Sequence, residues 1–307
     1  MKPYRIKHVD AFTRTPFTGN YAGVVLDADG LSDEQMHLIA REKNVPETAF
    51  ILSPTVKDAD IRIRWFTPQE EVPLCGHATI AGFHALAEEG MAGMKPEGQH
   101  YFRLQTKSGI LNVRVEKNFR GITVEFELPL PAFKVRKNLP AVMFKALGIT
   151  AKDLEKKMPV VSESYLYIPL KKLATLESLK PDFPLLIKAS KLLKVLGVSL
   201  LTLDTVEKGS SVHSRFFAPA VGINEDPVTG SANGPIGVYL YNYAARAGFS
   251  VRHRDLADGR IEYVGEQGDE VDRPGRVKIR LRLNNAIPES VCVAGEAITV
   301  MDSTLRF

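Results

Sequence analysis

Apolar and polar residues alternate with a period of two along much of the first half of the chain, which predicts half-buried β-strands. The predicted strands are 4–12, 22–26, 47–53, 60–66, 100–106, 110–116 and 121–127. One surface helix is predicted at 32–43, where Ser32 can cap the first turn and Gln35 stands at the capping-box position. The first half therefore predicts a largely antiparallel sheet.

Two longer segments break this alternation. Residues 77–89 are apolar on almost every side and end at Gly90, and residues 232–247 repeat that character and end at Gly248. A helix that is apolar all round is a buried helix rather than a surface one. Each half of the chain is therefore expected to contain one central helix.

The second half repeats the plan of the first. Its predicted strands are 160–170, 198–206, 212–218, 249–254, 260–266, 275–283 and 290–300, with a lysine-rich helix at 182–196. Two prolines in Leu128–Pro131 break any regular element and mark a boundary. We expect an α+β fold of two pseudo-symmetric domains, 1–128 and 129–307, each a curled, mostly antiparallel sheet around a central helix. For the last strand, packing on the N-terminal domain is an alternative that the sequence leaves open.

A Pro-x-x-Gly-x-Ala pattern stands at the start of both central helices. It occurs at 73–78 and at 227–232, with an offset of 227 − 73 = 154, about half of the 307 residues. The first amides of a helix have no internal acceptor and carry partial positive charge. We therefore expect the two helix starts to face one cleft and to hold a small anion through the amides of 76–78 and 230–232.

Three titratable residues are candidates for proton transfer. His77 stands beside the first helix start, where it could bind a carboxylate, exchange a proton or merely cap its own helix. Glu47 lies between Pro46 and an apolar strand, where a charge is costly unless paired or protonated, although a strand-edge surface position is the alternative. Asp226 precedes the second helix, where ordinary N-cap chemistry is the competing interpretation. Asn20 could bind a ligand or hold an Asx turn.

The two cysteines test a different mechanism, in which one thiol from each half moves a proton. Cys75 directly precedes Gly76 at the first helix start, whereas residues 217–247 contain no cysteine. Cys292 lies in an apolar strand and is expected to pack in a core. The two-thiol mechanism therefore has a candidate thiol at the first helix start and none at the second.

Composition narrows the class of protein without identifying it. Hydrophobic residues make up 44% and charged residues 25%, which is ordinary for a globular protein, and two cysteines are too few for a disulfide framework. A net charge of +4, without interleaved aromatics, does not indicate nucleic-acid binding. No signal-peptide core, membrane-length segment or zinc-type Cys/His spacing is present, so a cytoplasmic protein without membrane or nucleic-acid partners is expected.

Five motifs in order resemble the PhzF family, the phenazine-biosynthesis-like proteins with a diaminopimelate-epimerase-type fold. The motifs lie at 10–20, 47–50, 66–68, 76–79 and 225–232. The resemblance covers essentially the whole chain and implies two similar domains, a homodimer and no metal, PLP or nucleotide cofactor. It also implies that Glu47 transfers protons while His77, Asp226 and Ser231 hold and polarise the substrate. Tyr21 departs from the family, which usually has proline there.

The sequence thus predicts a cofactor-independent isomerase that moves a proton on a small carboxylate-bearing metabolite. That metabolite is expected to carry an amino or hydroxy group and to be cyclic or unsaturated. Catalysis is assigned to Glu47, His77 and Asp226. The expected substrate-binding residues are Asn20, Gly76, Ala78, Gly230, Ser231 and Ala232. The alternatives are an amino-acid epimerase that uses Cys75 and a non-catalytic metabolite-binding protein.

Overall fold

The computed structural model describes residues 3–306 and divides the chain into two compact units. The first unit extends to Glu127 and includes the chain from Cys292 onward, and the second unit is Leu128–Val291. The chain from Cys292 onward thus groups with the first unit, the arrangement that the sequence left open for the last strand. Strand β18 (Ile287–Leu305) pairs antiparallel with β1 (Tyr4–Ala11), which ties the end of the chain to the first unit.

The strands of the first unit form one continuous ring. In order around it, these are β1, β2 (Asn20–Val25), β3 (Glu47–Leu52), β4 (Ile61–Phe66), β6 (Gly98–Thr106), β7 (Gly109–Asn118), β8 (Gly121–Leu128) and β18. The pairs β2–β3 and β4–β6 are parallel, and the other registered pairs are antiparallel. The short β5 (Glu71–Val72) adds to β4. The expected curled, mostly antiparallel sheet is confirmed.

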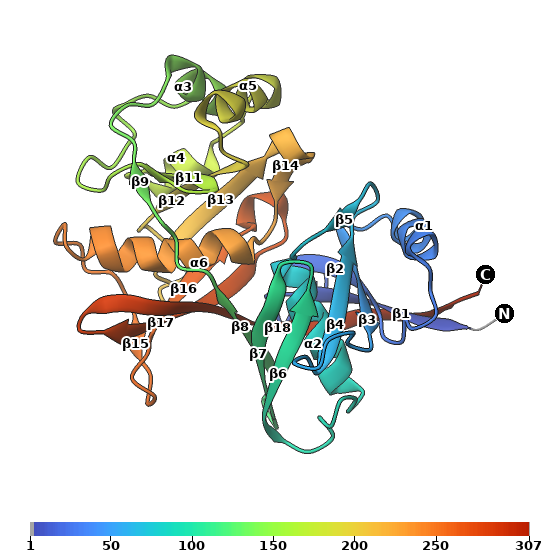
Figure 1. Ribbon diagram of the computed structural model, residues 1–307. Coiled ribbons are helices and arrows are strands. Elements are labelled where there is room, and N and C mark those ends of the chain that lie inside the picture. The colour runs from blue at the N-terminus through green and yellow to red at the C-terminus, as the bar shows by residue number, and fades with distance from the viewer. Residues whose placement is uncertain (1–2, 307) are drawn as a thin grey trace. The chain divides into compact units, whose positions relative to one another are not determined.

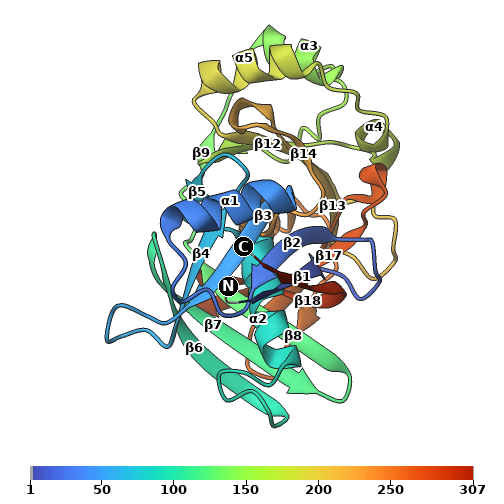
Figure 2. The same ribbon diagram turned by 90° about the vertical axis from the view of Figure 1, so that its right-hand side faces the viewer.

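Helix α2 (Gly76–Glu88) fills this ring, as Figures 1 and 2 show. All residues from His77 to Ala87 are buried, which is why the segment is apolar on every side. Phe83 packs against Phe102 of β6 with ring centroids 5.4 Å apart. A side chain at Gly82 would contact Ile51 of β3, so this face of the helix lies close to the sheet.

Helix α1 (Asp33–Lys43) covers the outside of the ring near β3 and β4 (Figure 2). Its buried residues Met36, Ile39 and Ala40 pack with Phe50 and Phe66 of these strands. The predicted capping box is confirmed, because Ser32 Oγ accepts from the Gln35 amide and Gln35 Oε1 accepts from the Ser32 amide. The helix ends at Asn44, whose left-handed conformation turns the chain toward β3.

The second unit contains its own series of paired strands within the continuous sheet. Its paired strands, in order, are β9 (Lys134–Val135), β10 (Val161–Ser162), β11 (Tyr165–Pro169), β12 (Gly197–Thr202), β13 (Val212–Ala218), β16 (Ile261–Gln267) and β17 (Gly275–Asn284). The short β14 (Ile223–Asp226) and β15 (Arg254–Asp255) pair with β13 and β16. Helices α3 (Ala141–Leu147), α4 (Leu173–Glu177) and α5 (Phe183–Leu193) pack on β11 and β12 through one apolar cluster.

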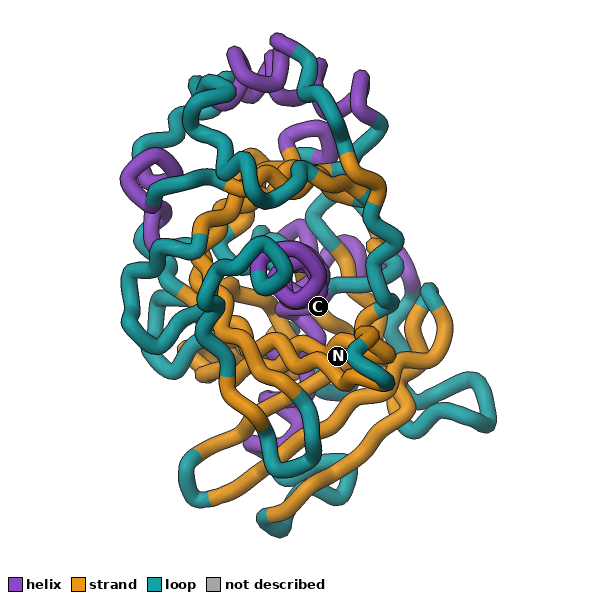
Figure 3. Tube along the Cα trace, turned by 90° about the vertical axis from the view of Figure 1, so that its left-hand side faces the viewer, coloured by secondary structure: helices purple, strands orange, loops and turns teal. Residues whose placement is uncertain are grey.

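Helix α6 (Gly230–Tyr239) is the central helix of the second unit. Figure 3 views it nearly end-on, with strands on more than one side of it. Gly237 lies so close to β17 that an added Cβ would stand 2.4 Å from Ile279 Cγ2, so only glycine fits there. Pro235 lies inside the helix, and the chain continues from Leu240 to Ala244 as a π-helical turn. The predicted continuous helix over 232–247 is therefore corrected to an α-helix followed by this turn.

No helix within residues 3–306 is long and apolar enough to cross a membrane.

Candidate functional site

The two central helices begin at matched positions. Helix α2 starts at Gly76 and α6 at Gly230, an offset of 230 − 76 = 154 that equals the sequence repeat. The residues before them, Cys75 and Thr229, have extended backbones, and neither side chain caps its own helix. The first turns of both helices therefore lack a side-chain cap from the preceding residue.

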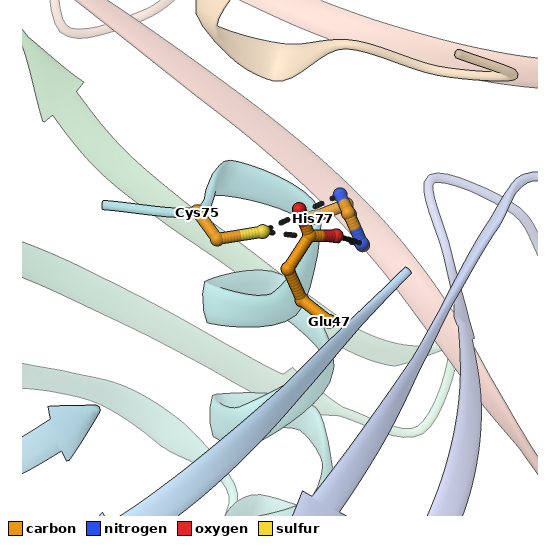
Figure 4. Close-up of side chains that lie close together, drawn as sticks. All are labelled: Glu47, Cys75 and His77. Atoms are coloured by element: carbon orange, nitrogen blue, oxygen red, sulfur yellow. Dashed lines mark hydrogen bonds and ion pairs between the residues drawn. The ribbon is translucent and has the colours of Figure 1, made fainter. Parts of the chain in front are cut away.

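Glu47 reaches the start of α2 from the first position of β3. It follows the turn made by Asn44, and its neighbour across the parallel β2 is Ala22. Its side chain is 12% exposed, so the strand-edge surface alternative is wrong. Glu47 Oε2 lies 3.1 Å from His77 Nε2, which compensates a carboxylate in an apolar surrounding. Figure 4 shows Glu47, Cys75 and His77 pointing toward one another.

Asn20 contacts the other ring nitrogen of His77. Its Nδ2 lies 3.3 Å from His77 Nδ1, and the Asn20 side chain is fully buried. An amide can donate through nitrogen or accept through oxygen, so Asn20 can serve either protonation state of the imidazole. Gly19 places Asn20 at the start of β2. It has a φ of +63°, and an added Cβ would stand 2.2 Å from the Ala11 carbonyl oxygen.

Cys75 completes the cluster without capping the helix. Its Sγ lies 3.5 Å from His77 Nδ1 and 3.9 Å from Nε2. Burial raises the pKa of the Cys75 thiol, and the nearby Glu47 charge raises it further, which favours the protonated thiol. The Cys75 carbonyl accepts from the Thr79 hydroxyl at 2.6 Å and from the Thr79 amide at 3.0 Å, fixing the helix start.

Burial and neighbouring groups shift the pKa of His77 in opposite directions. Burial on its own lowers the pKa of His77, but the charges and hydrogen bonds of Cys75 and Glu47 outweigh it and hold the pKa well above its usual range. Because burial keeps Cys75 as a thiol, we assign the increase mainly to Glu47. His77 and Glu47 lie one hydrogen bond apart, and the neighbouring carboxylate favours the protonated imidazole.

The start of α6 carries a different set of side chains. Asp226, at the end of β14, accepts a hydrogen bond from the Thr229 hydroxyl. Gln267 Oε1 accepts from the Thr229 amide at 3.0 Å and from Asn233 Nδ2 at 2.8 Å. Its Nε2 donates to the Asp226 carbonyl at 2.8 Å and to Thr229 Oγ1 at 3.1 Å. This amide network fixes the approach to the helix.

The remaining predicted residues lie at the first turn of α6. Ser231 Oγ lies 3.1 Å from the Tyr165 hydroxyl, at the first turn of α6. Ala232 is 1% exposed and packs with Phe216 and Ala218, and its amide donates to the Thr229 carbonyl. The amide of Ala232 is therefore engaged within the helix start.

Two residues of this second network were missed in the sequence. Gln267 precedes Gly268, which has a φ of +92° and whose added Cβ would stand 2.3 Å from the Arg273 carbonyl oxygen. Tyr165 opens β11. Both lie far from α6 along the chain, so no local pattern points to them. The glycine after Gln267 was the single available signal, because it marks a sharp turn at the strand end.

A curled sheet around one central helix in each unit is a fold shared by solved structures that are named as a predicted epimerase and as an isomerase. The profile of the phenazine biosynthesis-like proteins matches residues 9–303, and the chain belongs to this family.

Relatives and solved structures agree with this assignment. An uncharacterized isomerase of Clostridium acetobutylicum is 38% identical, covering 99% of both chains. The trans-2,3-dihydro-3-hydroxyanthranilate isomerase of Pseudomonas aeruginosa is 31% identical, covering 90% of both. The crystal structure of a Bacillus anthracis PhzF-family protein matches with a TM-score of 0.86 and 32% identity over 100% of both chains. More distant racemases and epimerases share the fold alone. The predicted family, fold class and isomerase character are confirmed.

Proposed function

We propose that this protein is a cofactor-independent isomerase that moves a proton between two carbons of a small, unsaturated carboxylate. The observation that carries the proposal is the buried Glu47–His77 contact of 3.1 Å at the uncapped start of α2. A carboxylate held beside an imidazolium can accept a proton and return it without leaving the site. The substrate class follows from the amides, which favour an anion.

In the proposed reaction, Glu47 takes a proton from a carbon of the substrate. The electron pair of that C–H bond moves into the adjacent unsaturated system, and the negative charge spreads toward the substrate carboxylate. Amides at the start of α2 and the His77 imidazolium stabilise this charge. Glu47 then delivers the proton to another carbon, so the product has the same atoms and electrons as the substrate.

The start of α6 has a binding role in this proposal. The amides of Gly230 and Ser231 are expected to bind an anionic group, with Ser231 and Asp226 orienting its polar substituents. Asp226 already accepts from the Thr229 hydroxyl, which favours a fixed acceptor over a mobile proton carrier. We therefore place proton transfer on Glu47 and His77 and substrate orientation on Asp226.

A substrate assay tests this proposal. Because the relative from Pseudomonas aeruginosa is named for trans-2,3-dihydro-3-hydroxyanthranilate, this compound is the first to test. Other amino- or hydroxy-substituted cyclic carboxylates follow. Nuclear magnetic resonance should detect an isomer in extensively dialysed, chelator-treated enzyme without added cofactor. A substrate with deuterium at the reacting C–H should turn over more slowly. Turnover that depends on an added cofactor would contradict the proposal.

An epimerase that uses Cys75 is the second candidate, because Cys75 Sγ lies 3.5 Å from His77 Nδ1. Two observations weigh against it. Burial keeps the thiol protonated, and the matched position before α6 is Thr229 rather than a second cysteine. Racemisation of proline or hydroxyproline by the wild-type protein, with loss in Cys75→Ala, would favour the epimerase. A cytoplasmic location and a homodimer stay predictions from the sequence.

A further inference from the structure

Three kinds of metal ligand meet at the start of α2. The carboxylate of Glu47, the sulfur of Cys75 and the imidazole of His77 lie within 4.8 Å of one another, and all three residues are buried. They come from two places in the chain, the first position of β3 and the first turn of α2 (Figure 4). Acid–base chemistry uses Glu47 and His77, which leaves the thiol unexplained.

The spacing of these atoms matches a tetrahedral metal centre. Zinc bonds of about 2.0–2.3 Å to oxygen, nitrogen and sulfur place neighbouring tetrahedral ligands roughly 3.3–3.7 Å apart. His77 Nε2 lies 3.1 Å from Glu47 Oε2 and 3.9 Å from Cys75 Sγ. The third pair, a Glu47 carboxylate oxygen and Cys75 Sγ, lies within 4.8 Å, so side-chain movements of no more than about 1.2 Å would bring all three atoms to bonding distance of one ion.

The chemistry of the three ligands selects among metals. Thiolate and imidazole suit Zn²⁺, whereas Mg²⁺ and Ca²⁺ require oxygen ligands. The positive end of α2 disfavours a cation by itself. The thiolate and the carboxylate together carry two negative charges, which balance a divalent ion. Three protein ligands leave a fourth position for water, as in other open zinc sites.

We propose that Glu47, Cys75 and His77 form a zinc-binding site and that zinc bound there inhibits the enzyme. Binding forms bonds to Sγ, to one ring nitrogen and to a carboxylate oxygen, and it releases to solvent both the thiol proton and the imidazolium proton from the coordinating nitrogen. The metal thereby occupies the groups assigned to proton transfer. The inhibitory part rests on the proposed function, whereas the binding part does not.

Direct metal binding tests the site without any substrate. Zinc affinity of the full-length, metal-free protein is measured by competition with a chromophoric chelator, and Co²⁺ is used as a spectroscopic probe. Wild-type protein should bind one equivalent and show a thiolate-to-cobalt charge-transfer band. Loss of a residue that only hydrogen-bonds to a metal ligand weakens metal sites by about 10–100-fold, so loss of a direct ligand in Cys75→Ser should weaken binding at least that much and abolish the band. Cys292→Ser is the matched control and should keep both.

Two further variants separate the loss of a metal ligand from the loss of the folded structure. Glu47→Gln and His77→Asn each remove one ligand from a different element, and circular dichroism establishes that each variant is folded. Both should weaken zinc binding and, unlike Cys75→Ser, retain the sulfur-to-cobalt band at high cobalt concentration. Unchanged zinc affinity in folded Cys75→Ser, or zinc binding that needs Cys292, would overturn the site.

Turnover tests the inhibitory part. One equivalent of zinc should abolish turnover in wild-type and Cys292→Ser protein, a chelator should restore it, and Mg²⁺ at the same concentration should have no effect. Zinc that binds without changing turnover, or that increases it, would overturn inhibition. If metal-free protein isomerises none of the tested carboxylates, the proposed function fails while the cobalt and zinc titrations still decide the site.

Discussion

The starts of α2 and α6 occupy matched positions in a duplicated chain, yet their side chains differ in kind. At α2, three titratable residues, Glu47, Cys75 and His77, contact one another in a buried cluster. At α6, Thr229 stands where α2 has Cys75, and the uncharged Gln267 bridges the chain on both sides of the helix start.

This difference separates two requirements of an isomerase. A group that gives and takes protons must lie near a partner that stabilises both of its states, as His77 does for Glu47. A group that only orients an anion is better held by hydrogen bonds that do not titrate. The amide of Gln267 makes four such contacts. In the proposed function, the first helix start carries the chemistry and the second orients the substrate.

The largest expected effect comes from removing the proton carrier at α2. Glu47→Gln keeps the volume and the hydrogen-bonding capacity but removes the titratable group, so turnover should fall by at least about 10²-fold. Ligand affinity should change little, because the helix amides are untouched. Steady-state kinetics with calorimetric binding of a substrate analogue separate the two. Retained turnover would remove Glu47 from its role and move the role to His77 or Asp226.

The ion cluster beside Gln267 gives the next largest effect, on stability rather than turnover. His213 is fully buried, and its Nδ1 and Nε2 each lie 2.9 Å from a carboxylate oxygen, of Glu266 and Glu270 respectively. Burial lowers the pKa of His213, but the hydrogen bonds to both carboxylates outweigh it and raise the pKa from 6.5 to about 9. The difference corresponds to roughly 3 kcal/mol of stability.

The sign of the pH dependence follows from these values. A histidine whose pKa is raised on folding contributes its full stability below about pH 6.5 and loses it as the pH rises through about 9. Glu266 has a pKa lowered to about 2, because its hydrogen bonds outweigh burial, so its contribution is present above about 4.5 and is lost on acidification toward 2. The free energy of unfolding of the wild type, measured in urea, should fall between about pH 6.5 and 9. In His213→Gln this fall should be smaller. An equal decline in the variant would contradict the assignment.

A smaller effect is expected from Gln267→Leu, which keeps the volume and removes the amide. The Thr229 amide and the Asn233 side chain would each lose a buried partner, so the free energy of unfolding should fall by about 2–3 kcal/mol. If α6 only orients the substrate, KM should rise more than kcat falls. Gln105→Leu is a control, because Gln105 is a surface residue that bonds Thr55. A fall in kcat with unchanged KM would move chemistry to α6.

Local patterns in the sequence predicted the elements that depend on local chemistry. The capping box at Ser32 and the all-round apolar character of α2 are fixed by neighbouring residues. The predicted strand over 249–254 is wrong except for its last residue, because β15 finds a partner only at Arg254–Asp255. Alternation predicts which residues can form a strand, but a partner strand decides whether they do. The helices α3 and α4 are short segments that were not predicted.

The candidate site, like the fold, was predictable only where neighbouring residues in the sequence determine it. Glu47 and His77 stand in motifs at element starts, so their types and positions were visible in the sequence. Gln267 and Tyr165 gain their roles only by contacts with Thr229 and Ser231, across 38 and 66 residues of chain. The contact of Cys75 with His77 follows from the geometry of the α2 start and not from its place before a glycine.

The smallest effect, and the sharpest test of the comparison, is expected for Cys75→Ala. If the two helix starts differ because only α2 carries the carboxylate and the imidazole, the thiol is dispensable for isomerisation. Burial keeps it protonated near neutral pH, and Thr229 at the matched position supplies no second thiol. Turnover in chelator-treated buffer should stay within about tenfold of wild type, and the free energy of unfolding should fall by about 1 kcal/mol for the small cavity. Kinetics and thermal unfolding, with Cys292→Ala measured in parallel, check both values. Loss of turnover by several orders of magnitude in a folded Cys75→Ala protein would make the sulfur a reacting group and favour the epimerase over the isomerase.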